Sequence, residues 1–212
     1  MAWALQFDGV NDYATLDSTV SFANTGEYLI EIKIKIDATP VNSINSVLWF
    51  DLSNYFYYRT SNELFFWQFG GSNRSVSALT GDVLGKVVTV YLKQDAAGAK
   101  SIEVVGGNTS AEFTSLRTFD FNQFVRDGNW ELDGGILEVI IYSDLARTTI
   151  INHWDATSSS HAAGTPVLVD TISGNDATGV NMPTDGSAWV DLGGGGISIP
   201  VIMNQLRNQG IS

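Results

Sequence analysis

The sequence contains no cysteine, and only four prolines and two histidines among its 212 residues. The absence of cysteine excludes disulfides, thiol catalysis and cysteine-ligated metal sites. Lysine and arginine total 11 against 23 aspartates and glutamates, which gives a net charge of −12. A surface this acidic repels phosphate groups, so we expect neither nucleic acid nor an anionic membrane as a partner.

Long apolar runs are also missing. No window approaches the roughly 20 apolar residues of a membrane span, and Met1–Asp8 has no basic stretch. We therefore expect no signal peptide and no membrane association. Hydrophobic residues make up 44% of the chain and charged residues 16%, a balance typical of a folded domain with a substantial core.

The clearest local pattern has a period of two residues. Isoleucines alternate with charged residues between Tyr28 and Asp37, and a similar alternation covers residues 88–93. Successive side chains of a strand point to opposite faces, so these segments predict strands with one buried and one solvated face. Sheets of that kind are usually antiparallel.

Turn signals and one helical pattern complete the outline. Glycine-rich and Asn–Asp turns separate the other short strands, and we expect Gly134 and Gly135 to break a strand. Leu145, Ile151 and Trp154 follow helical spacing, which predicts a helix within Asp144–Asp155. Many short strands with such punctuation favour a β-sandwich or barrel.

Several segments resemble a known family. In chain order they are Leu5–Tyr13, Glu27–Asp37, Gly85–Tyr91, Leu132–Leu145 and Asp170–Gly179. They resemble pieces of laminin-G-like, concanavalin A-like jelly-roll domains. The resemblance implies an all-β, antiparallel two-sheet jelly-roll sandwich over residues 1–192, with one or two short helices. This fold hosts lectins, glycosidases, adhesion modules and viral surface proteins, so the resemblance alone does not assign a function.

The resemblance also implies that a structural calcium ion could be bound at a loop edge, and we expect no other cofactor. Calcium takes about six to eight oxygen ligands, often Asp carboxylates and loop carbonyls. If the two chain ends meet, the candidate ligands are Asp8, Asn11, Asp12, Asp170, Asn175 and Asp176. The alternative is that these residues only cap turns.

An enzymatic role is not expected. Jelly-roll glucanases place their carboxylates on one strand as Glu-x-Asp-x-x-Glu or Glu-x-Asp-x-Glu, and the nearest match is Glu131, Asp133 and Glu138. Glu131 and Glu138 are seven residues apart, an odd number, so a regular strand would place them on opposite faces. His153, on the expected helix, is interpreted as a packing residue, because no catalytic motif surrounds it.

Aromatic residues concentrate in one stretch, Trp49–Phe69, which contains ten of them. One face of these strands can fill the core, and the other must be covered or exposed. Exposed Tyr and Trp rings suit either sugar stacking or a protein interface. The rings assigned to a glycan platform or a subunit interface are Tyr55, Tyr57, Tyr58 and Trp67.

The last segment has its own pattern. Residues 193–196 are four glycines, which predict a flexible tether. Within the tail 197–212, an apolar stripe falls at i, i+3, i+4 and i+7, formed by Ile199, Ile202, Met203 and Leu206. A helix this short is marginal alone in water, so the stripe needs a surface to bind. That surface belongs either to a partner or to the tail's own domain.

Stand-alone domains that resemble this one are familiar among tailed-phage structural proteins. We therefore expect a non-catalytic virion protein, a head decoration or a tail or fibre component, assembled in the host cytoplasm. Its partners would be other virion proteins or copies of itself, with a cell-surface glycan as a further ligand. The alternative is a carbohydrate-binding, lectin-like module, and a second alternative is a β-glucanase-like glycosidase.

Overall fold

The computed structural model describes residues 2–37, 44–59, 63–69, 75–79, 83–114, 117–126 and 132–193. Within these ranges the chain forms strands joined by turns, and it contains no helix. None of the described segments is therefore an apolar helix of membrane-spanning length. The predicted tether beyond Gly193 and the docking tail with Ile199, Ile202, Met203 and Leu206 lie outside the described residues, so both stay predictions.

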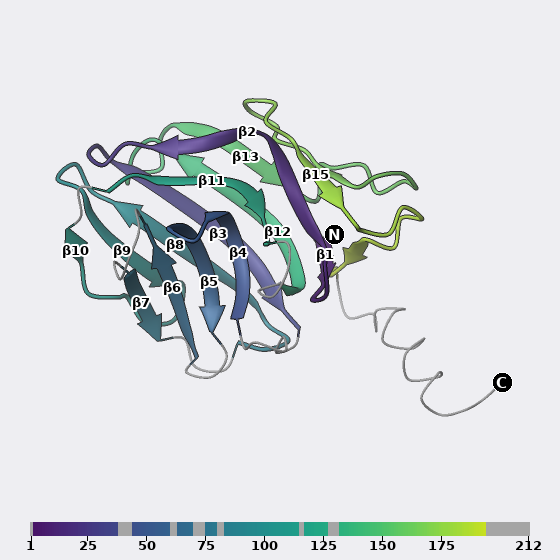
Figure 1. The fold of residues 1–212 in the computed structure, drawn as a ribbon, viewed down its shortest axis with the longest axis horizontal. Coiled ribbons are helices and arrows are strands. Elements are labelled where there is room, and N and C mark those ends of the chain that lie inside the picture. Colours follow the sequence, from purple (N-terminus) through teal and green to yellow (C-terminus); the bar gives the residue numbers. More distant parts are fainter. Residues whose placement is uncertain are drawn as a thin grey trace.

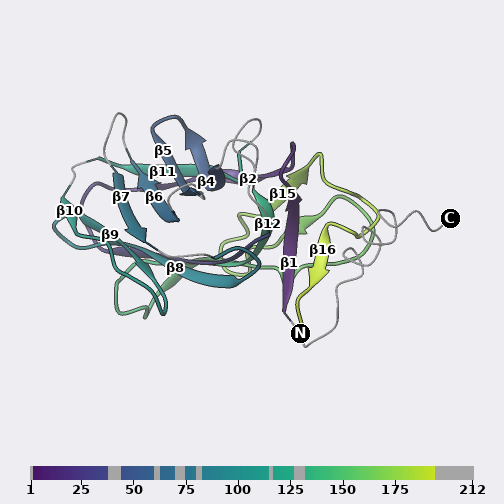
Figure 2. The ribbon, with the colours of Figure 1, turned by 90° about the horizontal axis from the view of Figure 1, so that it is seen from below.

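Two antiparallel sheets form the molecule, and they lie one above the other as two layers (Figures 1 and 2). The first sheet contains, in spatial order, β10 (Phe113–Thr114), β9 (Ala99–Val104), β8 (Val87–Gln94), β3 (Tyr28–Ile36), β12 (Asp133–Tyr142), β1 (Trp3–Asp8) and β16 (Trp189–Asp191), with β13 (Ile150–Asp155) also paired to β12. The N- and C-terminal strands β1 and β16 are neighbours.

The second sheet contains β14 (Val167–Leu168), β15 (Ala177–Val180), β2 (Tyr13–Phe22), β11 (Phe119–Phe124), β4 (Ile44–Asp51), β5 (Asn54–Arg59), β6 (Leu64–Gln68) and β7 (Ser75–Leu79). Every pairing between named strands is antiparallel. The predicted all-β jelly-roll sandwich is confirmed.

The core lies between the two layers, and the alternating segment behaves as predicted. Ile30, Ile32, Ile34 and Ile36 are fully buried, whereas Lys33 and Lys35 on the same strand are half-buried on the outer face. Large aromatic side chains of the second sheet pack against this isoleucine surface within one continuous cluster. Burial of that apolar area is the main term that stabilises the fold.

The helix predicted within Asp144–Asp155 is wrong. Asp144 instead closes a turn, in which its carboxylate accepts hydrogen bonds from the backbone N–H groups of Thr148 and Thr149. Arg147 adopts a left-handed φ of 60°, which interrupts any helix. The chain then continues as β13, where Trp154 enters the core and Ile151 stays 39% exposed.

Candidate functional site

A row of aromatic rings lies on the outer face of the second sheet. Along β5, Phe56 and Tyr58 point into the core, so Tyr55 and Tyr57 point outward. Tyr55 pairs with Trp49 of β4, and Tyr57 pairs with Phe66 of β6. None of these four outward rings belongs to the core cluster. We call Trp49, Tyr55, Tyr57 and Phe66 the ring row.

The four rings contact one another in sequence. Ring centroids are 5.3 Å apart between Trp49 and Tyr55, 5.3 Å between Tyr55 and Tyr57, and 5.0 Å between Tyr57 and Phe66. Trp49 and Tyr55 are each only 8% exposed, whereas Tyr57 and Phe66 are half-buried. Tyr57 and Phe66 therefore present the accessible ring surface, and Trp49 and Tyr55 support it from the side.

Polar groups border the rings. The Tyr55 hydroxyl donates a 2.7 Å hydrogen bond to Gln68 Oε1, and Gln68 Nε2 donates to the Leu52 carbonyl. Burial raises the pKa of Tyr55 above its usual value, with Arg126 acting in the opposite direction. Burial, followed by the neighbouring Tyr55, raises the pKa of Tyr57 to about 12. Both hydroxyls stay protonated at neutral pH and can donate hydrogen bonds.

A strained backbone position places an arginine over the row. Val125, directly after β11, has a φ of 64°, and its N–H donates a 3.0 Å bond to the Val47 carbonyl. Left-handed φ is unfavourable for a β-branched residue and costs about 1–3 kcal/mol. The next residue, Arg126, holds its guanidinium carbon 4.3 Å from the centroid of the Trp49 ring. Strain of this kind often marks a functional position.

The predicted platform is therefore corrected at two of its four residues. Tyr58 is 1% exposed and Trp67 is fully buried, because both point into the core, where no sugar or subunit could reach their rings. Tyr55 and Tyr57 lie on the outer face as the platform requires. The prediction omitted Trp49 and Phe66. These residues join the row because they pair with Tyr55 and Tyr57 across neighbouring strands, and the sequence alone does not reveal that pairing.

The calcium candidates do not form one site. Strand β15 pairs with β2 from Ala177 opposite Leu16 to Val180 opposite Tyr13. Asp8, Asn11 and Asp12 precede one end of this ladder, whereas Asp170, Asn175 and Asp176 precede the other. Asp176 lies beside Asp17, so about five residues of strand separate it from Asp12. Among the described residues, no group of three or more acidic or histidine side chains is arranged to hold a metal. The six candidates are therefore divided between two places, and calcium binding itself stays a prediction.

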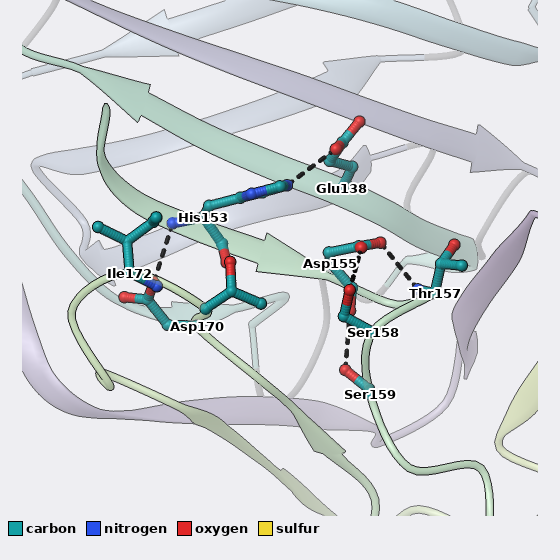
Figure 3. Close-up of polar contacts among 9 residues, drawn as sticks. Glu138, His153, Asp155, Thr157, Ser158, Ser159, Asp170 and Ile172 are labelled. Atoms are coloured by element: carbon teal, nitrogen blue, oxygen red, sulfur yellow. Dashed lines mark hydrogen bonds and ion pairs between the residues drawn. The ribbon is translucent and has the colours of Figure 1, made fainter. Parts of the chain in front are cut away.

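Asp170 instead joins its own loop to β13 through several hydrogen bonds (Figure 3). Its carboxylate accepts bonds from the N–H of His153 at 2.9 Å and of Ile172 at 3.0 Å, and from the Asn152 side chain at 2.8 Å. The Ser173 hydroxyl and N–H also donate to it. Burial opposes ionisation, but these donors outweigh it and lower the pKa of Asp170 to about 2. With its oxygens already engaged, Asp170 is a structural residue.

Asp12 belongs to a separate acidic group at the start of β12. It is 2% exposed, and its Oδ2 accepts a 3.2 Å bond from the Asp8 N–H, while its Oδ1 has no partner among the described residues. Burial and then the charge of Asp8 raise the pKa of Asp12 to about 6. Burial, followed by the charges of Asp37 and Asp8, also raises the pKa of Asp133.

This shift gives a test. The Asp12 carboxyl group has a pKa of 3.8 in the unfolded chain and about 6 in the folded protein, so its ionisation favours the unfolded state. The folded state is therefore fully stable with respect to this group below pH 3.8 and loses stability as the pH rises to 6. We expect Asp12→Asn to raise the free energy of unfolding by roughly 1–2 kcal/mol above pH 6 and to change it little below pH 4. Urea denaturation at both extremes measures this. Equal effects at the two pH values would contradict the assignment.

The glucanase-like carboxylates also take unexpected positions. Glu131 lies outside the described residues. Asp133 and Glu138 are five residues apart, so on a regular strand they would point to opposite faces. A bulge between Ile136 and Glu138 inserts one extra residue into β12, and both carboxylates therefore lie on the outer face. Five residues of strand still separate these two by roughly 15 Å, well beyond the 5–9.5 Å that glycosidases use. Glu138 contacts His153 Nε2 at 2.9 Å.

Comparisons with known proteins address the fold. No protein-family model matches the chain, and no curated protein matches it. A Bacteroides ovatus protein proposed to bind carbohydrate superposes with a TM-score of 0.61, at 13% identity over 86% of this chain. This chain spans 61% of that protein's length.

Two further solved structures were found with lower scores. A heptameric SAP-like pentraxin from Limulus polyphemus has a TM-score of 0.47 and 11% identity, covering 68% of this chain and 76% of its own. Domains LG4-5 of the mouse laminin α1 chain have a TM-score of 0.47 and 13% identity, covering 71% and 44%. At such identities, structural likeness concerns the fold and not the ligand.

Proposed function

We propose that this protein is a carbohydrate-binding, lectin-like module and that its ligand lies along the ring row. The observation that carries the proposal is four adjoining rings placed outside the core, two of them partly accessible. Aromatic rings give a sugar's C–H groups an apolar surface, and the nearby Tyr57 hydroxyl and Gln68 amide can bond to its hydroxyls. The fold shared with the Bacteroides ovatus protein supports the proposal.

The virion structural role favoured by the sequence receives no support from the fold or the comparisons. A binding module is also the better proposal than a glycosidase, because the described carboxylates Asp133 and Glu138 are too far apart to act as a pair. The interface alternative for the ring row makes a different prediction, since rings buried between subunits would bind no glycan.

The test is a glycan array followed by titration calorimetry on any sugar that binds. We expect Tyr57→Ala and Phe66→Ala each to weaken binding about tenfold or more, because anchoring aromatic residues carry most of the energy at such sites. Tyr91→Ala is the matched control, since Tyr91 is a half-buried tyrosine on the outer face of the other sheet.

Unchanged affinity in both Tyr57→Ala and Phe66→Ala would show that the glycan does not bind at the ring row. An array with no bound glycan, together with a dimer that Tyr57→Ala dissociates, would overturn the proposal in favour of a subunit interface.

A further inference from the structure

The second sheet leaves part of one strand edge unpaired. Strand β2 pairs with β15 from Tyr13 to Leu16, and from Ser18 onward no described strand lies on that side, although β11 continues on the other. One side chain covers the next position, since the Ser18 N–H donates to Asn175 Oδ1 at 2.7 Å and Asn175 Nδ2 donates to the Ser18 carbonyl at 3.0 Å. Residues 19–22 therefore form an edge that another extended segment could continue.

This edge borders a groove of about 440 Å³. The facing wall comes from β13 and from the loop that precedes β15. The described lining consists of residues 17–22, Ile151, Asn152 and residues 173–175. Ile151 is 39% exposed, and Ile172, which adjoins the lining in the chain, is 53% exposed. Apolar surface is thus available for burial on the wall opposite the β2 edge.

The groove suits an extended peptide better than a sugar. The Asn152 and Asn175 amide groups and the Ser173 hydroxyl already donate hydrogen bonds within the protein. Phe22, the aromatic residue of the described lining, is only 6% exposed, so it offers little ring surface for stacking. The accessible groups that remain are the main chain of β2 and short side chains, which is the arrangement used when a strand adds to a sheet edge.

Charge favours a segment of this chain as the occupant. Asp17 is the one charged residue of the described lining. Residues 194–212 contain no acidic residue and one arginine, Arg207, so the other residues, with 10 basic and 23 acidic side chains, carry a net charge of −13. A segment without carboxylates is not repelled by this acidic body. Residues 197–203 are rich in isoleucine and valine, which favour strands, and their single proline is tolerated at a sheet edge.

The chain leaves the fold close to the groove. Strands β1 and β13 lie one after the other along the same edge of β12, because β3 occupies the opposite edge. Asn152 pairs five residues further along β12 than Leu5 does, which is about 17 Å of strand. Strand β16 runs beside β1 and is followed by Leu192, whose N–H donates to the Ala2 carbonyl at the end of β1 nearer to β13. Six extended residues beyond Gly193 span up to about 20 Å, so the segment is long enough to reach its own groove.

We propose that residues 197–203 add to the edge of β2 as an extra strand in the groove of the same molecule. The added strand covers Ile151 and Ile172 and continues the second sheet where β15 ends. It also closes an edge that would otherwise pair with other chains. A short tether raises the effective concentration of the segment at its own groove, which favours this arrangement over exchange between molecules. The inference is independent of carbohydrate binding.

Cross-linking in the full-length chain tests the contact, and the absence of native cysteine makes each introduced pair unambiguous. Ser21→Cys is combined, one protein at a time, with a cysteine at each position from 197 to 203. Thr157→Cys is the matched control partner, because Thr157 is exposed and borders the same small pocket as Ala2, near the start of the segment. We expect at least one pair with Ser21→Cys to form a disulfide within the molecule about tenfold faster than any pair with Thr157→Cys.

Hydrogen exchange in the full-length protein tests the strand pairing itself. Ile199→Asp places a carboxylate on the added strand and should make the groove-facing amides of residues 19–22 exchange about tenfold faster. Ile211→Asp is the control, since it introduces the same charge outside residues 197–203. Thermal melting of each variant verifies that the sandwich is folded.

Three results would overturn the proposal. Equal cross-linking rates for Ser21→Cys and Thr157→Cys would show that the segment does not prefer the groove. Unchanged exchange in Ile199→Asp would exclude strand pairing even if the cross-link forms. Disulfides that join two molecules, detected as dimers on a non-reducing gel, would assign the groove to the segment of a neighbouring copy.

Discussion

Replacing Gly134 with alanine is expected to lower the free energy of unfolding by about 3 kcal/mol or to prevent folding. Gly134 lies within β12 between β1 and β3, opposite Phe7 and Ile36. A Cβ atom there would be 2.1 Å from the Lys35 carbonyl oxygen and 2.9 Å from the Ile36 Cα atom, and its φ of 155° is unfavourable for other residues. The clash involves backbone of a central strand, which cannot move without breaking the pairing that buries the isoleucine face.

Urea denaturation followed by circular dichroism measures this prediction. Gly107→Ala is the control, because Gly107 lies in an exposed turn. Its added Cβ would meet the Val104 side chain at 3.3 Å and the Val104 carbonyl oxygen at 3.4 Å, contacts much longer than those at Gly134. We expect that control to stay within about 0.5 kcal/mol of the native protein. A Gly134→Ala protein with native stability would mean that β12 and β3 are not packed as closely as described.

Gly134 also shows where inference from the sequence is unreliable. Two adjacent glycines predicted a strand break, but β12 runs through both of them. Gly135 is needed for a second close approach, since its Cβ would be 2.8 Å from that of Ala4. Turn-forming and close-packed glycines have the same local sequence, and only the neighbouring strands distinguish them.

Alternation along β3 was predictable because it is a local property. The isoleucines between Tyr28 and Ile36 are buried on one side, as their period requires. The aromatic segment was harder, because β5 carries rings on both faces and periodicity cannot say which face is inside. That choice depends on which strands lie opposite. Tyr55 and Tyr57 lie on the outer face, with Tyr55 largely covered by its neighbours, whereas Tyr58 and Trp67 point into the core.

The remaining features of the candidate site depend on long-range geometry. Nothing near Val125 in the sequence indicates a left-handed backbone, so the placement of Arg126 over Trp49 could not be foreseen. The grouping of calcium candidates failed for a related reason. It assumed that Asp8 and Asp170 meet when the termini meet, whereas the β2–β15 ladder holds them at opposite ends.

Asp170→Ala is expected to have the largest effect among polar substitutions, lowering the free energy of unfolding by about 4 kcal/mol. Asp170 is 3% exposed and accepts bonds from β13 and from its own loop, including the N–H groups of His153 and Ile172 (Figure 3). Removing the carboxylate leaves the buried Asn152 amide and several part-buried donors without this acceptor, which costs more than the net value of one hydrogen bond.

The pH dependence of the same residue supplies an independent test with the opposite sign to that of Asp12. Its folded pKa of about 2 lies below the usual 3.8, so its stabilisation is fully present above pH 3.8 and is lost as pH falls toward 2. The native protein should therefore lose stability over this interval, and Asp170→Ala should lose less. Asp170→Asn, which keeps one acceptor oxygen, should fall between the two at neutral pH.

Asp185→Ala is the control for Asp170, because Asp185 is exposed and bonds only to Ser187 among the described residues. It should change the denaturation midpoint little. Hydrogen exchange adds a local measurement, since the His153 and Ile172 amides should lose protection in Asp170→Ala before the amides of β3 do. Native stability and protection in Asp170→Ala would show that the loop does not depend on this carboxylate. Selective loss at His153 and Ile172 would instead place Asp170 as the contact that joins the loop to β13.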